Sequence, residues 1–518
     1  MSTAGMRVRH AVSAALAISV LGSSPGAYAQ SCDDLSSFRY DGVDIEITSA
    51  RHVAAGGEGG VAGLPSHCRV EGVVDERVGV NDVTYGIRFA LALPDDWNGR
   101  FLFQGGGGLN GTVGEPVGGT AAGDVSALER GFAVVSTDTG HRGAVFDASF
   151  MQDQQAALDF FYAANTKLTP VAKAMLAAHY GRESDYAYFV GCSTGGREGM
   201  IMSQRNPGFF DGIVSGAPAM RTGHSNMSLA YINAAFSQFA EVDPNGPAGP
   251  GSLFDAGDRE LIMSSLLASC DAEDGLADGM IFNTRSCRFD PGTLVCGPDN
   301  GDACLSSGQV AALERAFTGP VDSLGNQVYP PFPWDPGLNF SGAGLPGILV
   351  SGGSSPVQAQ RTSGEFNVDA EQAALFADAL GRIGDSTLKN LSSFRQSGSK
   401  ILFFHGMSDP WFSANDTRLY YEALADANGG EAAVESFARL FLVPGMGHCR
   451  GGTVTLDRFD LLSAVVDWVE NDVAPDRVVS TGDALPGQSR PLCSYPGYAH
   501  YTGGDSRLAG SFECRRAD

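Results

Sequence analysis

The sequence predicts an α/β protein built on a mostly parallel β-sheet with helices on both faces. Short runs rich in β-branched and aromatic residues alternate with stretches whose apolar residues recur at helical spacing. Such alternation is typical of a parallel sheet, because two parallel strands need a crossover, usually a helix, between them. In addition, one strand-like run ends in a glycine-flanked serine, and two later runs end in an acid and in a histidine.

Before these elements, the chain begins with the three parts of a secretory signal peptide. Two arginines precede an apolar stretch, residues 11–21, and the small residues Ala27 and Ala29 mark a cleavage site. The apolar stretch is too short for a membrane span, and no later segment approaches about 18 uninterrupted apolar residues. We therefore leave residues 1–29 out of the fold. We predict a protein secreted to the periplasm or beyond, after cleavage near Ala29.

The predicted core elements follow in order along the chain. Strand-like runs occupy residues 100–104, 132–137, 186–190, 212–215, 400–404 and 440–443. Amphipathic patterns predict helices within residues 153–180 and 415–427. Between residues 220 and 397 the alternation stops, and the chain is rich in glycine, proline and polar residues. This region carries four of the ten cysteines and predicts a domain inserted between two halves of an α/β core.

Composition excludes some partners and favours a disulfide-bonded protein. The chain has 34 basic and 59 acidic residues, a net charge of −25. Because such a surface repels phosphate backbones and anionic lipids, we expect neither nucleic-acid nor membrane partners. Ten cysteines behind an export signal predict disulfides. The alternative, free thiols or a zinc site, is disfavoured because the sequence has no C-x-x-C pair and no clustered histidines.

The segment Gly191-Cys192-Ser193-Thr194-Gly195 has the pattern of a nucleophile elbow. It follows a predicted strand and opens a helix-like stretch. Small residues are needed on both sides of the serine, because the serine occupies a sharp strand-to-helix turn with little room beneath it. Ser193 is therefore the predicted nucleophile.

Two later strand ends supply residues that would activate this serine. The apolar run 400–404 leads to Asp409, and the run 440–443 leads to His448. The order serine, acid, histidine is that of the α/β-hydrolases. In this chemistry His448 takes the proton of the serine hydroxyl, and the acid orients the imidazole.

Other residues compete for these roles. Asp335 and Asp457 are alternative acids. His405 lies four residues before Asp409 at the end of the same strand, and we expect it to line the floor of the site structurally.

Acyl transfer also needs two backbone N–H donors for the oxyanion that develops on the substrate. Thr194, directly after the nucleophile, supplies the first. The second is expected from the four glycines at 105–108, which follow the strand 100–104. A phosphate-binding loop is the alternative, but the motifs that accompany such loops are lacking.

An acidic, glycine-containing run lies in the inserted region. Its aspartates, Asp271, Asp274 and Asp278, are spaced by three and four residues. Carboxylate and carbonyl oxygens on tight turns can surround a hard cation, and calcium fits best. The spacing is not that of an EF-hand, and a solvated acidic loop is the alternative.

Together these motifs resemble the tannase and feruloyl esterase family of α/β-hydrolases. Cys192 precedes Ser193 and Cys449 follows His448, so the chain carries the Cys-Ser, Asp, His-Cys pattern of that family. The likeness runs over nearly the whole mature chain. It extends to the branch of the family that hydrolyses mono(2-hydroxyethyl) terephthalate.

The resemblance implies an α/β-hydrolase fold with an inserted, disulfide- and calcium-stabilised lid domain. It places the lid at 220–397, between core segments 30–219 and 398–518. It also selects Asp409 as the acid and Gly108 as the second oxyanion donor.

The resemblance further implies the partners of the metal and the cysteines. Calcium would be structural, held by the side chains of Asp271, Asp274 and Asp278 and the carbonyls of Leu276 and Met280. Local spacing and the family pattern suggest the disulfides Cys32–Cys68, Cys192–Cys449, Cys270–Cys287, Cys296–Cys304 and Cys493–Cys514.

The predicted function is a secreted serine carboxylic ester hydrolase acting on aromatic-acid esters of the feruloyl or galloyl type, through an acyl-enzyme. Phe412 and Trp334 are expected to contact the substrate. Arg361 resembles an arginine that grips the free carboxylate of a terephthalate monoester, although Glu365 and Phe366 depart from that pattern. Hydrolysis of such monoesters is the alternative within the same chemistry. A catalytically inactive hydrolase fold that serves as a binding module is the alternative of another class.

Overall fold

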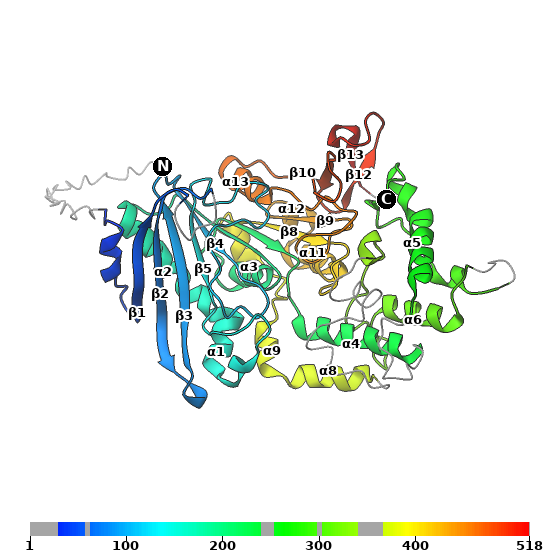
Figure 1. The fold of residues 1–518 in the computed structure, drawn as a ribbon, viewed down its shortest axis with the longest axis horizontal. Helices are drawn as coiled ribbons and strands as arrows, with labels where there is room; N and C mark the ends of the chain where they lie inside the picture. The colour runs from blue at the N-terminus through cyan, green and yellow to red at the C-terminus, as the bar shows by residue number, and fades with distance from the viewer. Residues whose placement is uncertain (1–28, 57–62, 240–252, 298–302, 340–365, 517–518) are drawn as a thin grey trace, which may run out of the picture.

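A nine-stranded mixed sheet forms the centre of the structure, a computed structural model that describes residues 29–56, 63–239, 253–297, 303–339 and 366–516 (Figure 1). Its strand order is β1-β2-β3-β5-β4-β6-β7-β8-β9. The strands are β1 (Ile45–Val53), β2 (His67–Val78), β3 (Thr84–Pro94), β4 (Arg100–Gln104), β5 (Ala133–Thr137), β6 (Tyr186–Cys192), β7 (Gly212–Gly216), β8 (Lys400–Gly406) and β9 (Ala438–Val443).

The predicted α/β fold is confirmed, with one addition. The strands from β5 to β9 in this order pair in parallel, and they are the six runs that the sequence predicted. Strands β1, β2 and β3 join them antiparallel and were not predicted. The central sheet is therefore mixed.

Helices cover both faces of this sheet, as the alternation predicted. The helices α2 (Ala164–Tyr180), α3 (Thr194–Arg205) and α11 (Ala414–Asn428) pack in the hydrophobic cluster on one face, and α13 (Leu461–Asn471) packs on the other. Strand β4 shows the alternation that separates the faces: Phe101 and Phe103 belong to the first cluster and Leu102 to the second. The predicted helix at 153–180 is divided into α1 (Gln154–Leu158), a π-helical turn (Asp159–Ala163) and α2.

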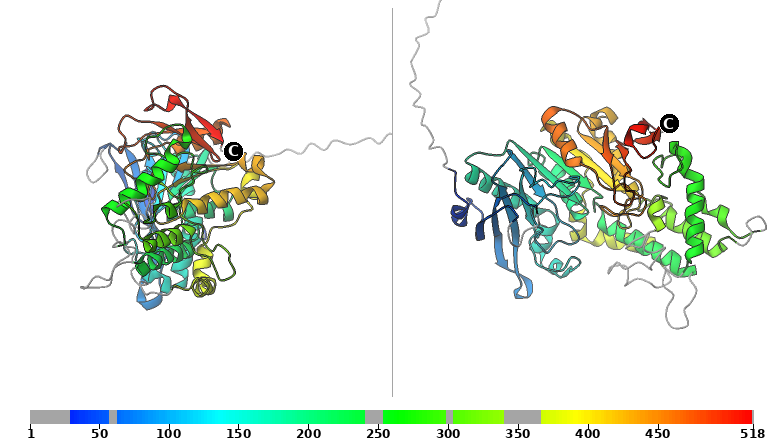
Figure 2. Two further views of the ribbon diagram at one scale, coloured as in Figure 1. Left: turned by 90° about the vertical axis from the view of Figure 1, so that its right-hand side faces the viewer. Right: turned by 45° about the horizontal axis from the view of Figure 1, so that its top comes forward.

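Where the structure describes it, the inserted region consists of helices joined by long loops and supplies no strand to the central sheet. Its helices α4 (Thr222–Phe239), α5 (Ala256–Cys270) and α6 (Ser307–Thr318) lie at the end of the molecule away from β1 (Figures 1 and 2). They share a hydrophobic cluster of their own. Three further helices, α8 (Val368–Ala377), α9 (Ala379–Gly384) and α10 (Ser392–Gln396), lead back to β8. The lid boundaries at 220 and 397 stay predictions.

Two small antiparallel sheets end the chain. They pair β10 (Arg477–Ser480) with β11 (Arg490–Cys493), and β12 (Gly497–Tyr501) with β13 (Phe512–Arg516). The second sheet lies beside the acidic run, and Leu276 and Phe282 pack against Ala499 and Phe512 (Figure 1). The C-terminal sheet and the acidic run, which are far apart in the sequence, thus pack together at the end of the molecule that carries the inserted helices.

All ten cysteines are paired, in the five disulfides that the family resemblance implied. They are Cys32–Cys68, Cys192–Cys449, Cys270–Cys287, Cys296–Cys304 and Cys493–Cys514. In the described part of the chain, no helix has the length and apolar character needed to cross a membrane. The predicted signal peptide falls almost entirely in residues 1–28, outside the described residues.

Candidate active site

Ser193 occupies a sharp turn between the end of β6 and the start of α3. Its backbone has φ 64° and ψ −121°, a left-handed conformation that is strained for a residue with a side chain. The flanking glycines permit this turn. A Cβ atom on Gly191 would lie 2.6 Å from the carbonyl oxygen of Gly195, and one on Gly195 would lie 2.7 Å from the carbonyl oxygen of Gly106. The elbow therefore has no room for larger residues.

The glycine loop after β4 packs directly against this elbow. The N–H of Gly195 donates to the carbonyl of Gly106 at 3.0 Å, and the Thr194 hydroxyl donates to the carbonyl of Gly108. Gly108 itself has φ +57°. Among the described residues the N–H of Gly108 has no acceptor, and Thr194 is the first residue of α3, where helical geometry leaves its N–H without a partner. The two predicted oxyanion donors are therefore adjacent and available.

A buried carboxylate, Glu198 on α3, holds the glycine loop in place and was missed by the sequence analysis. It accepts hydrogen bonds from the Gly106 N–H and the Asn110 side-chain amide, both at 3.1 Å. Burial raises the pKa of Glu198. The only signal in the sequence was a charged residue five positions after Ser193, on the first turns of a helix that packs against the sheet.

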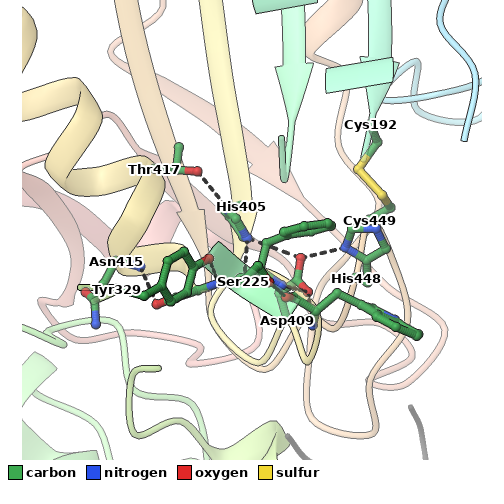
Figure 3. A network of polar contacts seen from close by, with 12 residues as sticks. Cys192, Ser225, Tyr329, His405, Asp409, Asn415, Thr417, His448 and Cys449 are labelled. Carbon is green, nitrogen blue, oxygen red and sulfur yellow. Dashed lines mark hydrogen bonds and ion pairs between the residues drawn. A yellow bond between two sulfur atoms is a disulfide. The ribbon is translucent and has the colours of Figure 1, made fainter. Parts of the chain in front are cut away.

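Asp409 and His448 lie next to each other, as their expected roles require. The Nδ1 atom of His448 is 2.6 Å from Oδ2 of Asp409 (Figure 3). The other carboxylate oxygen, Oδ1, accepts the backbone N–H groups of Trp411 at 2.8 Å and Phe412 at 3.1 Å. Burial alone would raise the pKa of Asp409, but the charges and hydrogen bonds of His448 and His405 lower the pKa well below its ordinary value. This acid is therefore ionised.

A disulfide connects the nucleophile segment to the histidine segment. Cys192 and Cys449, with Cα atoms 5.9 Å apart, directly precede Ser193 and follow His448 (Figure 3). Within the described residues the Ser193 hydroxyl makes no hydrogen bond to His448. Such contacts are often long without substrate, and here the bridge is the covalent link that keeps the two residues near each other.

The competing acids occupy other positions. Asp335 is fully buried and bridges the two loops that carry Asp409 and His448. Its Oδ1 accepts the Ser408 hydroxyl, the Gly445 N–H at 2.9 Å and the Gly337 N–H at 3.2 Å, while its Oδ2 is unpartnered. Asp457 accepts the Gly451 N–H at 2.7 Å. Neither acid has a hydrogen bond or ion pair with a histidine in the described structure.

The buried carboxyl group of Asp335 leads to a prediction about how the stability of the protein depends on pH. Burial raises its pKa to about 6, above the value of about 4 for an unfolded aspartate. The folded state therefore binds the proton more tightly, and this contribution to stability is full below about pH 4 and is lost as the pH rises through about 6. The side chain of Asp335→Asn cannot ionise. We therefore expect its free energy of unfolding to fall between pH 4 and 7 by on the order of 1–3 kcal/mol less than that of the wild type.

The measurement is the free energy of unfolding in urea at several pH values between 4 and 7. The wild-type value should fall more steeply with pH than that of Asp335→Asn. Other titrating groups cancel in this difference. Parallel curves for the two proteins would show that Asp335 does not titrate in this range.

The three predicted substrate contacts have different surroundings. The ring of Phe412 lies 5.5 Å from the His448 ring, centroid to centroid, so Phe412 borders the site. Trp334 stacks on Phe317 at 3.5 Å and packs with the inserted helices, which occupies one face of its ring. Arg361 lies outside the described residues.

The acidic run folds into tight turns with two nearly buried carboxylates, Asp271 and Asp274. Their side chains accept backbone N–H groups of the same run, and Asp278 pairs with Arg490. Burial, together with the charges of Asp278 and Asp271, raises the pKa of Asp274 to about 7. No group of three histidine, cysteine or acidic residues is arranged to hold a metal ion in the described residues.

Comparisons with known proteins agree on one family. A family model described as tannase and feruloyl esterase matches residues 68–360 and 366–515. The mono(2-hydroxyethyl) terephthalate hydrolase of Piscinibacter sakaiensis is 38% identical, over 91% of this chain and 88% of its own. Feruloyl esterase B of Aspergillus niger is 29% identical, over 90% of this chain and 92% of its own.

Solved structures give the same result. The crystal structure of feruloyl esterase B from Aspergillus oryzae matches with a TM-score of 0.76 and 25% identity, covering 93% of this chain and 99% of that one. The tannin acyl hydrolase of Aspergillus niger matches with a TM-score of 0.67 and 22% identity, covering 92% of this chain and 90% of that one, a likeness of fold.

Proposed function

Because the chain belongs to the tannase and feruloyl esterase family, we propose that it is an exported serine esterase that cleaves esters of aromatic acids through an acyl-enzyme. The observation that carries the proposal is the 2.6 Å contact between Nδ1 of His448 and the buried carboxylate of Asp409, beside a disulfide that joins the histidine segment to the nucleophile elbow of Ser193. Export is supported by the signal-like residues 1–29 and by five disulfides, which persist in oxidising compartments.

In the first half of the reaction, the Ser193 hydroxyl oxygen attacks the ester carbonyl carbon while Nε2 of His448 takes its proton. The negative charge moves to the carbonyl oxygen, where the N–H groups of Gly108 and Thr194 stabilise it. The tetrahedral intermediate then collapses. The bond to the alcohol oxygen breaks, His448 gives its proton to that oxygen, and the acyl group stays on the serine.

Water completes the cycle by the same steps. It attacks the acyl carbon, gives a proton to His448 and displaces the serine oxygen, which takes the proton back as the carboxylic acid leaves. Asp409 stays ionised throughout. It holds Nδ1–H of His448 and so directs Nε2 toward the serine, and its negative charge stabilises the imidazolium that forms in each half.

A substrate panel tests this function: methyl ferulate, methyl gallate and a saturated aliphatic methyl ester. The Phe412 ring beside His448 favours a flat acyl group, so we expect the aromatic esters to have the higher kcat/KM. A fluorophosphonate probe should label Ser193. No turnover of any ester together with no labelling would instead support the inactive binding module.

A terephthalate monoester belongs in the same panel as the second candidate substrate. The 38% identity to the mono(2-hydroxyethyl) terephthalate hydrolase favours it, and Arg361 is the residue proposed to bind its free carboxylate. A higher kcat/KM for the monoester than for methyl ferulate would place the protein with that branch of the family. The reverse order would place it with the feruloyl esterases.

We further propose that the acidic run binds a structural calcium ion, with the side chains of Asp271, Asp274 and Asp278 and the carbonyls of Leu276 and Met280 as ligands. Its support is chemical. Asp271 and Asp274 are almost wholly buried, and the three carboxylates lie close enough for their charges to act on one another. A hard cation with oxygen ligands would compensate these charges.

Chelation is therefore expected to lower the melting temperature by several degrees, because a ligand that binds only the folded state stabilises it. Ester hydrolysis well below that temperature should change little, since the run is remote from Ser193 in sequence and would hold the metal structurally. The measurements are calorimetry with and without chelator, and elemental analysis. The control is Asp271→Asn, which should be less stable and insensitive to chelator. An unchanged melting temperature and no bound calcium would refute the site.

A further inference from the structure

His405 at the end of β8 is in direct contact with the proposed catalytic acid. Its side chain is fully buried. Nε2 lies 3.1 Å from Oδ2 of Asp409 and 3.0 Å from the carbonyl oxygen of Phe412, and Nδ1 lies 2.8 Å from the hydroxyl of Thr417 on α11 (Figure 3). Both ring nitrogens are therefore engaged.

The partners of the ring determine which nitrogen carries the proton. Nε2 faces two acceptors, the ionised carboxylate of Asp409 and a backbone carbonyl, so Nε2 must be the donor. In the neutral ring Nδ1 is then an acceptor, and the hydroxyl of Thr417 can donate to it. Thr417 is itself fully buried, so no water competes for this bond. The arrangement selects one tautomer and one ring orientation.

With this contact, every side of the Asp409 carboxylate is occupied by a donor. Oδ1 accepts two backbone N–H groups, and Oδ2 accepts His448 at 2.6 Å and His405 at 3.1 Å. Two imidazoles thus approach one oxygen, one of them mobile in the reaction and one buried. A carboxylate held by four donors cannot rotate without breaking several of them.

We propose that His405 is a positioning residue for ester hydrolysis: held at Nδ1 by Thr417, it donates from Nε2 and orients the Asp409 carboxylate toward Nδ1 of His448. The inference rests on the proposed function, because Asp409 is the acid of that reaction. In the described structure the His405 ring has no hydrogen bond to Ser193, so its effect on the reaction would pass through Asp409. Hydrogen-bonded groups behind a reacting residue commonly have this role.

The charged groups around His405 define the expected pH behaviour. Asp409 and His448 face it from the loops after β8 and β9, and Asp416 on α11 lies near it, paired with Arg221. Removal of the His405 donor leaves Asp409 a more basic carboxylate. A more basic carboxylate holds the proton on His448 more tightly, so the acid limb of the kcat/KM profile should move to higher pH.

The test compares His405→Leu, His405→Gln and Thr417→Val on an aromatic methyl ester. We expect His405→Leu to lower kcat by roughly 10- to 100-fold with little change in KM and to shift the acid limb upward. Glutamine can place an N–H near the position of Nε2. His405→Gln should therefore recover most of the rate and the wild-type position of the acid limb in the pH profile of kcat/KM. Thr417→Val should give a smaller loss, because the ring then loses its hydrogen bond at Nδ1 but keeps the donor that faces Asp409.

A matched control is His67→Leu, since His67 is also a buried histidine of the central sheet, with one hydrogen bond to the Pro65 carbonyl at 2.8 Å. It should lose stability without a change in kcat or in the pH profile. The inference is wrong if His405→Leu keeps the wild-type kcat and profile, or if His405→Gln is as slow as His405→Leu with the same limb. Should His405→Leu not fold, His405→Gln and Thr417→Val decide the question. Lack of ester hydrolysis by the unaltered protein would instead refute the proposed function.

Discussion

Replacement of Ser193 by alanine is expected to leave the protein folded and to lower kcat for ester hydrolysis by at least about 1,000-fold. The hydroxyl is the only group that the substitution removes. Without it, no acyl-enzyme forms, and His448 and the oxyanion donors have nothing to activate. Because alanine keeps the Cβ atom and the same left-handed backbone is required, the melting temperature should change little.

The control for this experiment is Ser203→Ala on α3, the helix that directly follows Ser193. Ser203 is buried, and its hydroxyl donates to the Met200 carbonyl at 2.7 Å, within the helix. It should keep wild-type kcat and fluorophosphonate labelling, whereas Ser193→Ala loses both. Near-normal turnover in Ser193→Ala would remove this serine as the nucleophile.

Loss of the Cys192–Cys449 disulfide is expected to reduce kcat/KM by roughly 100-fold, because a misplacement of about 1 Å between reacting groups can cost that much. The bridge joins residues 257 positions apart in the chain. It spans the gap between Ser193 and His448, which share no hydrogen bond in the described structure. Cys449 also has φ 67°, so without the bridge the histidine loop can relax. The variant is the double substitution of both cysteines by serine.

The matched control is the same double substitution at Cys32 and Cys68, a bridge that ties the start of the chain to β2. Both variants should lose stability, on the order of 2–5 kcal/mol, measured by urea unfolding. Only the Cys192–Cys449 variant should lose activity beyond its loss of stability. Equal kcat/KM values for the two variants at a temperature where both are folded would contradict a role in alignment.

The parallel half of the sheet was predictable because its signal is local. Each parallel strand is buried on both faces and reads as a short continuous apolar run, such as β4 and β5. The antiparallel strands were not predicted. Strand β1 is partly exposed and has no strict alternation. Strand β3 does alternate, with Ile87, Phe89, Leu91 and Leu93 in one hydrophobic cluster, and this signal was overlooked.

The residues of the candidate site also fall into two groups, those that a local sequence pattern predicts and those that it does not. The elbow at Ser193 and the strand ends before Asp409 and His448 follow from short segments, since residues at the carboxyl ends of neighbouring parallel strands must meet at one edge of the sheet. The cysteine pairing came from local spacing together with the family pattern. For Asp335, the sequence offered only a competing acid, and the structure shows a bridge between two loops.

The sequence by itself thus determined the elements whose physics is local: strands from apolar runs, the turn at Ser193 from its small neighbours, and the chain order of the reacting residues. The tertiary structure alone decided which polar groups support them. Glu198 meets a loop 92 residues away, and Asp335 meets Gly445 across 110 residues. Contacts of this kind leave no periodic or local pattern in the chain, because a buried polar group is satisfied by whichever partner the packing of distant elements brings within hydrogen-bond distance.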